Sequence, residues 1–197
     1  MRNKILSSFI LTCLVLTLAS YAYSQTPVAS SPTSAIGSSP LNPAPIGVTV
    51  ADIISCGSGY TSYETYDIKI TLLEVVRREE AWERIKAASL STEPPKAGSE
   101  YILAHIRVEF LARGKPGDCS YELNEEEFTA ISSEGEECNP PSIVPPDDLK
   151  LLGRRLSSGD LVEGWATFFV GKDDNKSLLT FGGSIWFQLY PAGKPRN

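Results

Sequence analysis

Three cysteines are the side chains of this sequence with the clearest chemistry. Cys56, Cys119 and Cys138 follow the first two dozen residues, and in an oxidising compartment two of them would pair. Such a bond stabilises a fold by about 2–4 kcal/mol. All three pairings are open. We favour Cys119–Cys138, because both flank the segment around Phe128 and close a short loop, which would leave Cys56 free or linked to a partner.

The cysteine and histidine pattern carries no signature of a metal site or a hydrolase. No CxxC pair is present, and His105 is the single histidine. Hydrolytic triads need an imidazole beside a presented nucleophile, and the sequence has no G-x-S-x-G turn. We therefore expect no metal, no cofactor and no enzymatic activity.

Acidic side chains cluster between residues 122 and 137. Two carboxylates could in principle do glycosidase chemistry or bind Ca²⁺. The calcium-loop pattern is absent, including at residues 173–175. A solvated acidic edge that discourages sheet aggregation is the favoured interpretation, so an envelope hydrolase with paired carboxylates ranks last among the possible functions.

Aromatic side chains offer the best candidates for binding. Tyr60, Tyr63 and Tyr66 lie in a polar segment rich in Ser, Thr and Gly, which is typical of adaptable contact loops. The alternative is a packed crossover whose rings cover a sheet edge. Trp165 and Trp186 could form a sugar platform, although packing in the core or at an edge is the simpler interpretation.

The first residues have the layout of a secretory signal peptide. Arg2 and Lys4 precede an apolar run from residue 5 to residue 19, and small residues follow it. We expect residues 1–24 to be a signal peptide, cleaved after Ala22 or Ser24, with an uncleaved anchor as the alternative. Residues 25–46, nearly all Ser, Pro, Thr, Ala and Gly, predict a linker, and residues 47–197 one domain. The protein is thus expected to be secreted or at the cell surface.

The charge of the chain excludes one class of partner. Its formal net charge is −6, and loss of Arg2 and Lys4 makes it more negative. Binding to phosphate backbones requires clustered Lys and Arg, so we expect no nucleic acid. The sequence leaves the oligomeric state open.

Alternation with a period of two is the strongest structural signal. In Tyr101–Ala112 every even position is apolar, and Asp67–Val76 repeats the pattern. Further strands are expected at 47–53, 128–132, 161–170 and 185–190, with a hairpin tip at 133–136. A helix is expected at 79–89, with Trp82 capping an open edge of the core. The pattern predicts an all-β, immunoglobulin-like antiparallel β-sandwich with one short helix between strands.

Several segments also resemble a known group of proteins. Glu80-Ala81-Trp82 with Ile85, then Pro94-Pro95, then Glu163-Gly164-Trp165 are similar to a family of bacterial secreted domains of unknown function. That family is related in fold to a mycobacterial secreted immunoprotective antigen. The resemblance covers roughly residues 48–190 and departs at 54–65. It implies an immunoglobulin-like fold and an extracellular setting, and it transfers no catalytic residue.

These observations together favour a non-enzymatic, exported domain that binds a protein at the cell surface or in the medium. Tyr60, Tyr63 and Tyr66 are the predicted contact residues. A carbohydrate-binding module of the cell envelope is the alternative.

Overall fold

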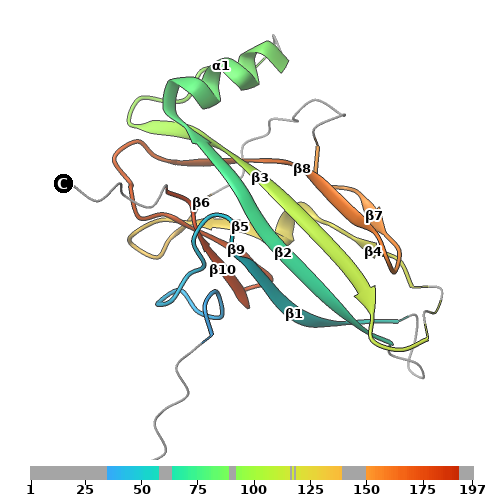
Figure 1. Cartoon of the computed structure of the whole chain (residues 1–197). Coiled ribbons are helices and arrows are strands. Elements are labelled where there is room, and N and C mark those ends of the chain that lie inside the picture. Colours follow the sequence, from blue (N-terminus) through green and yellow to red (C-terminus); the bar gives the residue numbers. More distant parts are fainter. Residues whose placement is uncertain are drawn as a thin grey trace, which may run out of the picture. The chain divides into compact units, whose positions relative to one another are not determined.

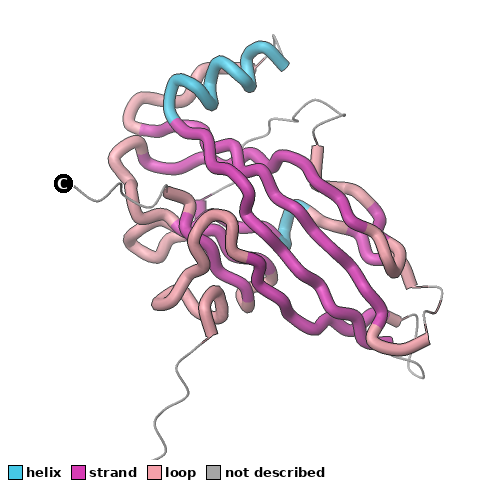
Figure 2. The backbone as a smooth tube through the Cα atoms, in the orientation of Figure 1, coloured by secondary structure: helices cyan, strands magenta, loops and turns pink. Residues whose placement is uncertain are grey.

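The computed structural model describes residues 35–57, 64–88, 92–115, 117, 119–138 and 150–190. Strands dominate this part of the chain, with one helix of 11 residues and a short 3-10 turn (Figures 1 and 2). In chain order the elements are β1 (Thr49–Cys56), β2 (Glu64–Arg77), α1 (Arg78–Ala88), β3 (Ser99–Ala112), β4 (Tyr121–Glu122), the 3-10 turn (Glu125–Glu127), β5 (Phe128–Ile131), β6 (Glu137–Cys138), β7 (Arg155–Leu156), β8 (Leu161–Gly171), β9 (Leu178–Phe181) and β10 (Ile185–Gln188).

Two four-stranded sheets form the body of the domain. The first has the order β1-β2-β3-β8 and the second β10-β9-β5-β6, while β4 and β7 form a small two-stranded sheet. Every pairing between these strands is antiparallel. Side chains from both larger sheets meet in one hydrophobic core. The architecture is therefore an all-β antiparallel sandwich with one helix between strands, as the sequence predicts.

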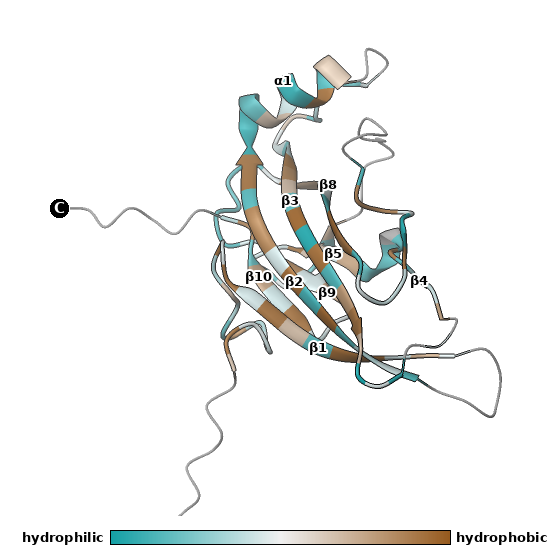
Figure 3. Ribbon diagram, turned by 45° about the vertical axis from the view of Figure 1, so that its right-hand side comes forward, coloured by the Kyte–Doolittle hydropathy of each residue, from teal (hydrophilic) through white to brown (hydrophobic). Residues whose placement is uncertain are grey.

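The alternation in β2 and β3 explains which side of the first sheet faces the core. Ile102, Ala104, Ile106 and Val108 are all buried, whereas the alternate residues His105, Arg107 and Glu109 are partly exposed. Hydrophobic and hydrophilic bands accordingly alternate along these strands (Figure 3). Because successive side chains point to opposite faces, one face of the sheet builds the core and the other is left outside.

The helix α1 packs on that outer face, beside the ends of β2 and β3 (Figure 1). Its buried residues Ala81 and Ile85 join a second hydrophobic cluster with Val76, Tyr101 and Leu103. Trp82 lies against this cluster, with its ring 6.1 Å from that of Tyr101 between centroids. The expected helix is confirmed, but Trp82 contributes to this second cluster and not to an open edge of the main core. Within the described ranges, no helix is long and apolar enough to span a bilayer.

The expected linker is wrong for its second half. Residues 35–46 belong to the same compact unit as the strands. Ala44 is fully buried and bridges to Phe187 of β10, and the backbone of Gly37 accepts a hydrogen bond from Trp186 N–H. The Ser- and Pro-rich composition conceals this contact, because a small side chain such as Ala44 can be buried without an apolar pattern around it. Residues 1–34, with the predicted signal peptide, lie outside the described residues.

The disulfide joins Cys56 to Cys119, so the expected Cys119–Cys138 pair is wrong. Cys56 ends β1, and its Cα lies 6.1 Å from that of Cys119, which precedes β4. Cys138 lies elsewhere, in β6 opposite Ala130 of the second sheet, and its thiol is free. The prediction relied on the short spacing between Cys119 and Cys138. The fold instead brings Cys119 next to the distant Cys56 and keeps it apart from Cys138.

Candidate functional site

Tyr66 does not belong to a binding surface. It is fully buried, and its ring stacks on Phe110 at 4.4 Å between centroids. Tyr66 shares the inward face of β2 with Ile68 and Ile70, so the alternation of that strand sends it to the core. Its prediction as a contact residue is wrong. The other two predicted contacts, at positions 60 and 63, lie outside the described residues.

The helix α1 covers one end of the outer face of the first sheet. No other described helix or strand covers the rest of this face, which we call the open face. Strand register builds it from three cross-strand rows. The rows are Thr49–Thr71–Arg107–Glu163, Ala51–Lys69–Glu109–Leu161 and Ile53–Asp67–Leu111. Ile53, Leu111 and Leu161 are each at least half exposed there. They are three of the five large apolar side chains that are exposed among the described residues.

The charged side chains of the open face are paired with one another or with Arg113 at its margin. Lys69 Nζ lies 3.6 Å from Glu109 Oε2, and Arg107 Nε lies 2.6 Å from Glu163 Oε1. At its margin, Arg113 Nε lies 2.6 Å from Asp67 Oδ1. Three positive and three negative side chains therefore cancel, on a chain whose formal net charge is −6.

His105 and Trp165 form the row between the open face and α1. Their rings stack at 4.7 Å with an interplanar angle of 14°, and the Arg84 guanidinium of α1 lies 5.4 Å from the Trp165 ring centroid. His105 Nε2 is also 3.8 Å from Glu163 Oε2. The imidazole is therefore part of a packed surface row. Because His105 and Arg84 already contact the Trp165 ring, this tryptophan is a poor sugar platform.

A second feature is a hollow of about 560 Å³ at the junction of β2 and α1. It is lined by residues 75–78, by Glu80 in the first turn of the helix, by residues of the β8–β9 turn and by Tyr190. No local pattern announces it, because its walls come from three separate parts of the chain. The sequence does not predict these residues as a site.

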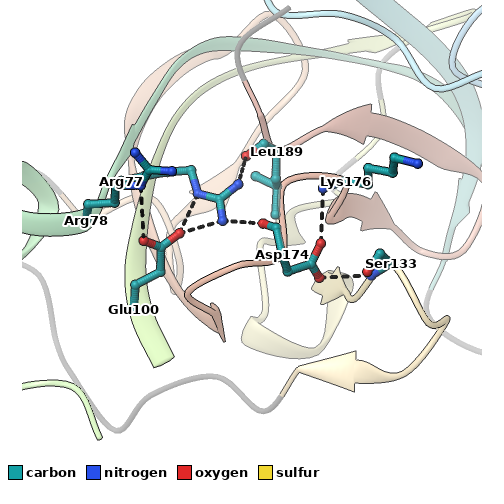
Figure 4. Close-up of polar contacts among 7 residues, drawn as sticks. All are labelled: Arg77, Arg78, Glu100, Ser133, Asp174, Lys176 and Leu189. Atoms are coloured by element: carbon teal, nitrogen blue, oxygen red, sulfur yellow. Dashed lines mark hydrogen bonds and ion pairs between the residues drawn. The ribbon is translucent and has the colours of Figure 1, made fainter. Parts of the chain in front are cut away.

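Arg77 forms the base of this region (Figure 4). Its Nε–H donates to Glu100 Oε1 at 2.7 Å, and its Nη groups donate to the main-chain carbonyls of Asp174 and Leu189. Arg77 therefore ties together β2, β3, the β8–β9 turn and the segment after β10. Glu100 is only 3% exposed, so the pair is largely removed from water. We call these four residues the Arg77 network.

Asp174 extends the network to the second sheet. Its carboxylate accepts hydrogen bonds from the backbone N–H groups of Ser133 at 2.9 Å and Lys176 at 3.0 Å (Figure 4). The Ser133 bond anchors the β5–β6 hairpin, whose Gly135 has φ +86°. Both carboxylate oxygens of Asp174 are thus engaged, which leaves it poorly placed as a general base.

Arg78 has a strained backbone. Its φ is +61°, and it is the one non-glycine residue with positive φ in the described chain. That conformation costs an ordinary residue about 1–2 kcal/mol. Its side chain is 74% exposed beside the hollow, and Nε is 4.0 Å from Glu100 Oε2. Strain at an exposed cation next to a hollow is a feature that function often maintains.

The titratable groups whose pKa values are shifted do not line the hollow. Burial raises the pKa of Glu127, although the hydrogen bond from Tyr121 acts in the opposite direction. Burial and the same contact raise the pKa of Tyr121. Burial also raises the pKa of the Cys138 thiol, with smaller contributions from Asp174 and Glu136. Cys138 is therefore mainly protonated and weakly reactive at neutral pH.

The described residues contain no group of three or more His, Cys, Asp or Glu side chains that could hold a metal ion. The acidic run expected as a solvated edge is partly engaged: Glu122 pairs with Arg155 at 3.2 Å and Glu127 with Tyr121.

Comparisons with known proteins give weak likenesses to solved structures, among them the following two. No family model matches the chain, and no curated protein matches it. The yjhA protein from Bacillus subtilis is 17% identical, with a TM-score of 0.42 over 70% of this chain and 78% of that one. The secreted protein MPT63 from Mycobacterium tuberculosis is 12% identical, with a TM-score of 0.40 over 62% and 83%. The expected likeness to a mycobacterial secreted antigen is thus found at a low score. Membership of the family of unknown function stays a prediction.

Proposed function

We propose that this protein is an exported, non-catalytic domain that binds another protein through the open face. The observation that carries the proposal is the combination, on one sheet face, of exposed Ile53, Leu111 and Leu161 with charges that cancel in pairs. Apolar side chains at the centre of an interface supply binding free energy when a partner covers them.

Internal pairing of the charges favours the same function. A partner that covers a lone charge must offset its desolvation, whereas Arg107 and Glu163 already neutralise each other. The partner we expect therefore has a largely uncharged, partly apolar surface. The acidic remainder of the chain would repel acidic proteins at longer range.

Export is supported by the leader-like first residues and by the Cys56–Cys119 bond. Disulfides persist in oxidising compartments and are rare in the cytosol. The disulfide also fixes the end of β1, the strand that carries Ile53. It thus helps to hold the open face in one shape.

The proposal is tested by capture of envelope proteins on the full-length protein, followed by affinity measurements with the purified partner. The test variant is Ile53→Ser/Leu111→Ser/Leu161→Ser. The matched control is Ile36→Ser/Leu41→Ser, which removes the two other exposed large apolar side chains, both in the segment that packs on β10. We expect the test variant to lose at least about tenfold in affinity and the control to bind normally. Equal binding by both variants would refute the proposal.

A further inference from the structure

The hollow beside α1 differs from the open face in its unpaired cations. Lys172 and Lys176 both belong to the β8–β9 region that lines it, and neither side chain has an ion pair with another described residue. Arg78, whose Nε lies 4.0 Å from Glu100 Oε2, adds a third positive charge from the junction of β2 and α1. On a chain with a formal net charge of −6, three cations around one hollow form a local exception.

The acidic groups nearby are already engaged. Glu80 pairs with Arg84 at 2.7 Å, and the buried Glu100 is neutralised by Arg77. Backbone N–H groups hold both carboxylate oxygens of Asp174. The balance of free charge facing the hollow is therefore positive.

The hollow is also rigidly supported. The Arg77 network fixes the end of β2 and the β8–β9 turn to each other, so the cations on the two walls are carried by segments joined at their base (Figure 4). Val75 and Val76 add an apolar wall, and Tyr190 adds an aromatic one. The strained backbone of Arg78 places its side chain at this rim, where a relaxed conformation would direct the chain differently.

We propose that the hollow binds a small anion, a carboxylate or phosphate group on a short apolar body. Arg78, Lys172 and Lys176 would supply the positive charge that attracts the anionic group, and the valines and Tyr190 would cover the apolar part. Arg supplies a planar donor fork and Lys a point charge, and both suit such oxygens. This site is separate from the open face and independent of the partner proposed for it.

The test is isothermal titration of the full-length protein with three probes. Inorganic phosphate and hexanoate distinguish the two kinds of anionic group, and hexanamide is the uncharged match for hexanoate. We expect saturable binding of at least one anion, no binding of hexanamide, and weakening as salt is raised. Absence of saturable binding of both anions at low ionic strength would overturn the proposal.

Two variants localise the binding. Lys172→Gln/Lys176→Gln is compared with Lys115→Gln/Arg155→Gln, which removes the same charge from two exposed positions outside the hollow. We expect about tenfold weaker binding for each rim lysine removed and no change in the control. Arg78→Gly removes the third cation at a φ that glycine adopts freely, so it should weaken binding while the melting temperature is kept or raised. Unchanged anion affinity in both rim variants would overturn the proposal.

Discussion

The open face and the hollow lie on the same domain but differ in how their charged side chains are paired. On the open face, Lys69, Arg107 and Arg113 each have an acidic partner within 4 Å, and the exposed apolar side chains of Ile53, Leu111 and Leu161 lie beside these pairs. At the hollow, Lys172 and Lys176 have no ion pair with a described residue, while the ion pair below them is buried. Exposed pairs contribute little to stability, whereas a buried pair is costly to break. The difference indicates that a neutral surface suits a protein partner and an unbalanced one suits a charged ligand.

The largest expected effect comes from the disulfide, which holds the open face from one end. In the variant Cys56→Ser/Cys119→Ser the free energy of unfolding should fall by about 4 kcal/mol, because the bond links residues separated by 63 positions and restricts the unfolded chain. Urea denaturation measures the loss. Native-state hydrogen exchange should show faster exchange in β1 and little change at residues 172–177. Faster exchange at both regions alike would mean that the disulfide does not favour the open face. Cys138→Ser is the control and should keep the wild-type stability within about 1 kcal/mol.

Breaking the Arg77 network should have a slightly smaller effect, concentrated at the hollow. Glu100→Gln keeps the shape of the side chain but leaves the buried Arg77 guanidinium without its counter-charge. We expect a loss of about 3 kcal/mol in the free energy of unfolding, measured in urea. The carbonyl groups of Asp174 and Leu189 continue to accept from Arg77, which keeps the loss from being larger. A loss below about 1 kcal/mol would show that this pair behaves like one on the surface.

A substitution that relieves the backbone strain at Arg78 should raise the stability of the fold, whereas the two preceding variants lower it. Arg78→Gly should stabilise the fold by up to about 1 kcal/mol, because glycine accepts φ +61° at no steric cost. The loss of the 4.0 Å contact with Glu100 reduces this gain. Thermal unfolding measures the change. A clear fall in melting temperature would identify Arg78 as a structural residue of the network.

The smallest effect is expected from a charge pair on the open face. Glu109→Gln removes the partner of Lys69, whose side chain is 44% exposed, so the loss should stay within about 1 kcal/mol. Raising the salt concentration should erase the difference from wild type, since exposed pairs are screened. A loss comparable with that of Glu100→Gln would end the distinction between the two regions.

The sequence predicts the fold better than it predicts the sites. Strict alternation identifies β2 and β3, and the helix formers identify α1. The sequence does not predict strand β9 (Leu178–Phe181), because a short run without alternation has the pattern of neither a half-buried strand nor a turn. The binding prediction failed at Tyr66 for a related reason: its polar neighbours suggested a loop, yet the register of β2 directs it inward.

The two sites depend on contacts that no local pattern records. The open face becomes visible only when register places Ile53, Leu111 and Leu161 from three strands on one surface. The hollow requires the β2–α1 junction to meet the β8–β9 turn, about a hundred residues later in the chain. The alternation within each strand indicates which apolar positions are exposed. It does not indicate which residues of the adjacent strands lie beside them.

The most direct test of the contrast between the two regions is an NMR titration of the ¹⁵N-labelled protein with inorganic phosphate, at low and at physiological ionic strength. We predict saturable shifts of the backbone amides of Arg78, Lys172 and Lys176 at low salt, smaller shifts at physiological salt, and no shifts at Ile53, Leu111 or Leu161. Shifts of similar size on the open face, or none at the hollow, would contradict the account.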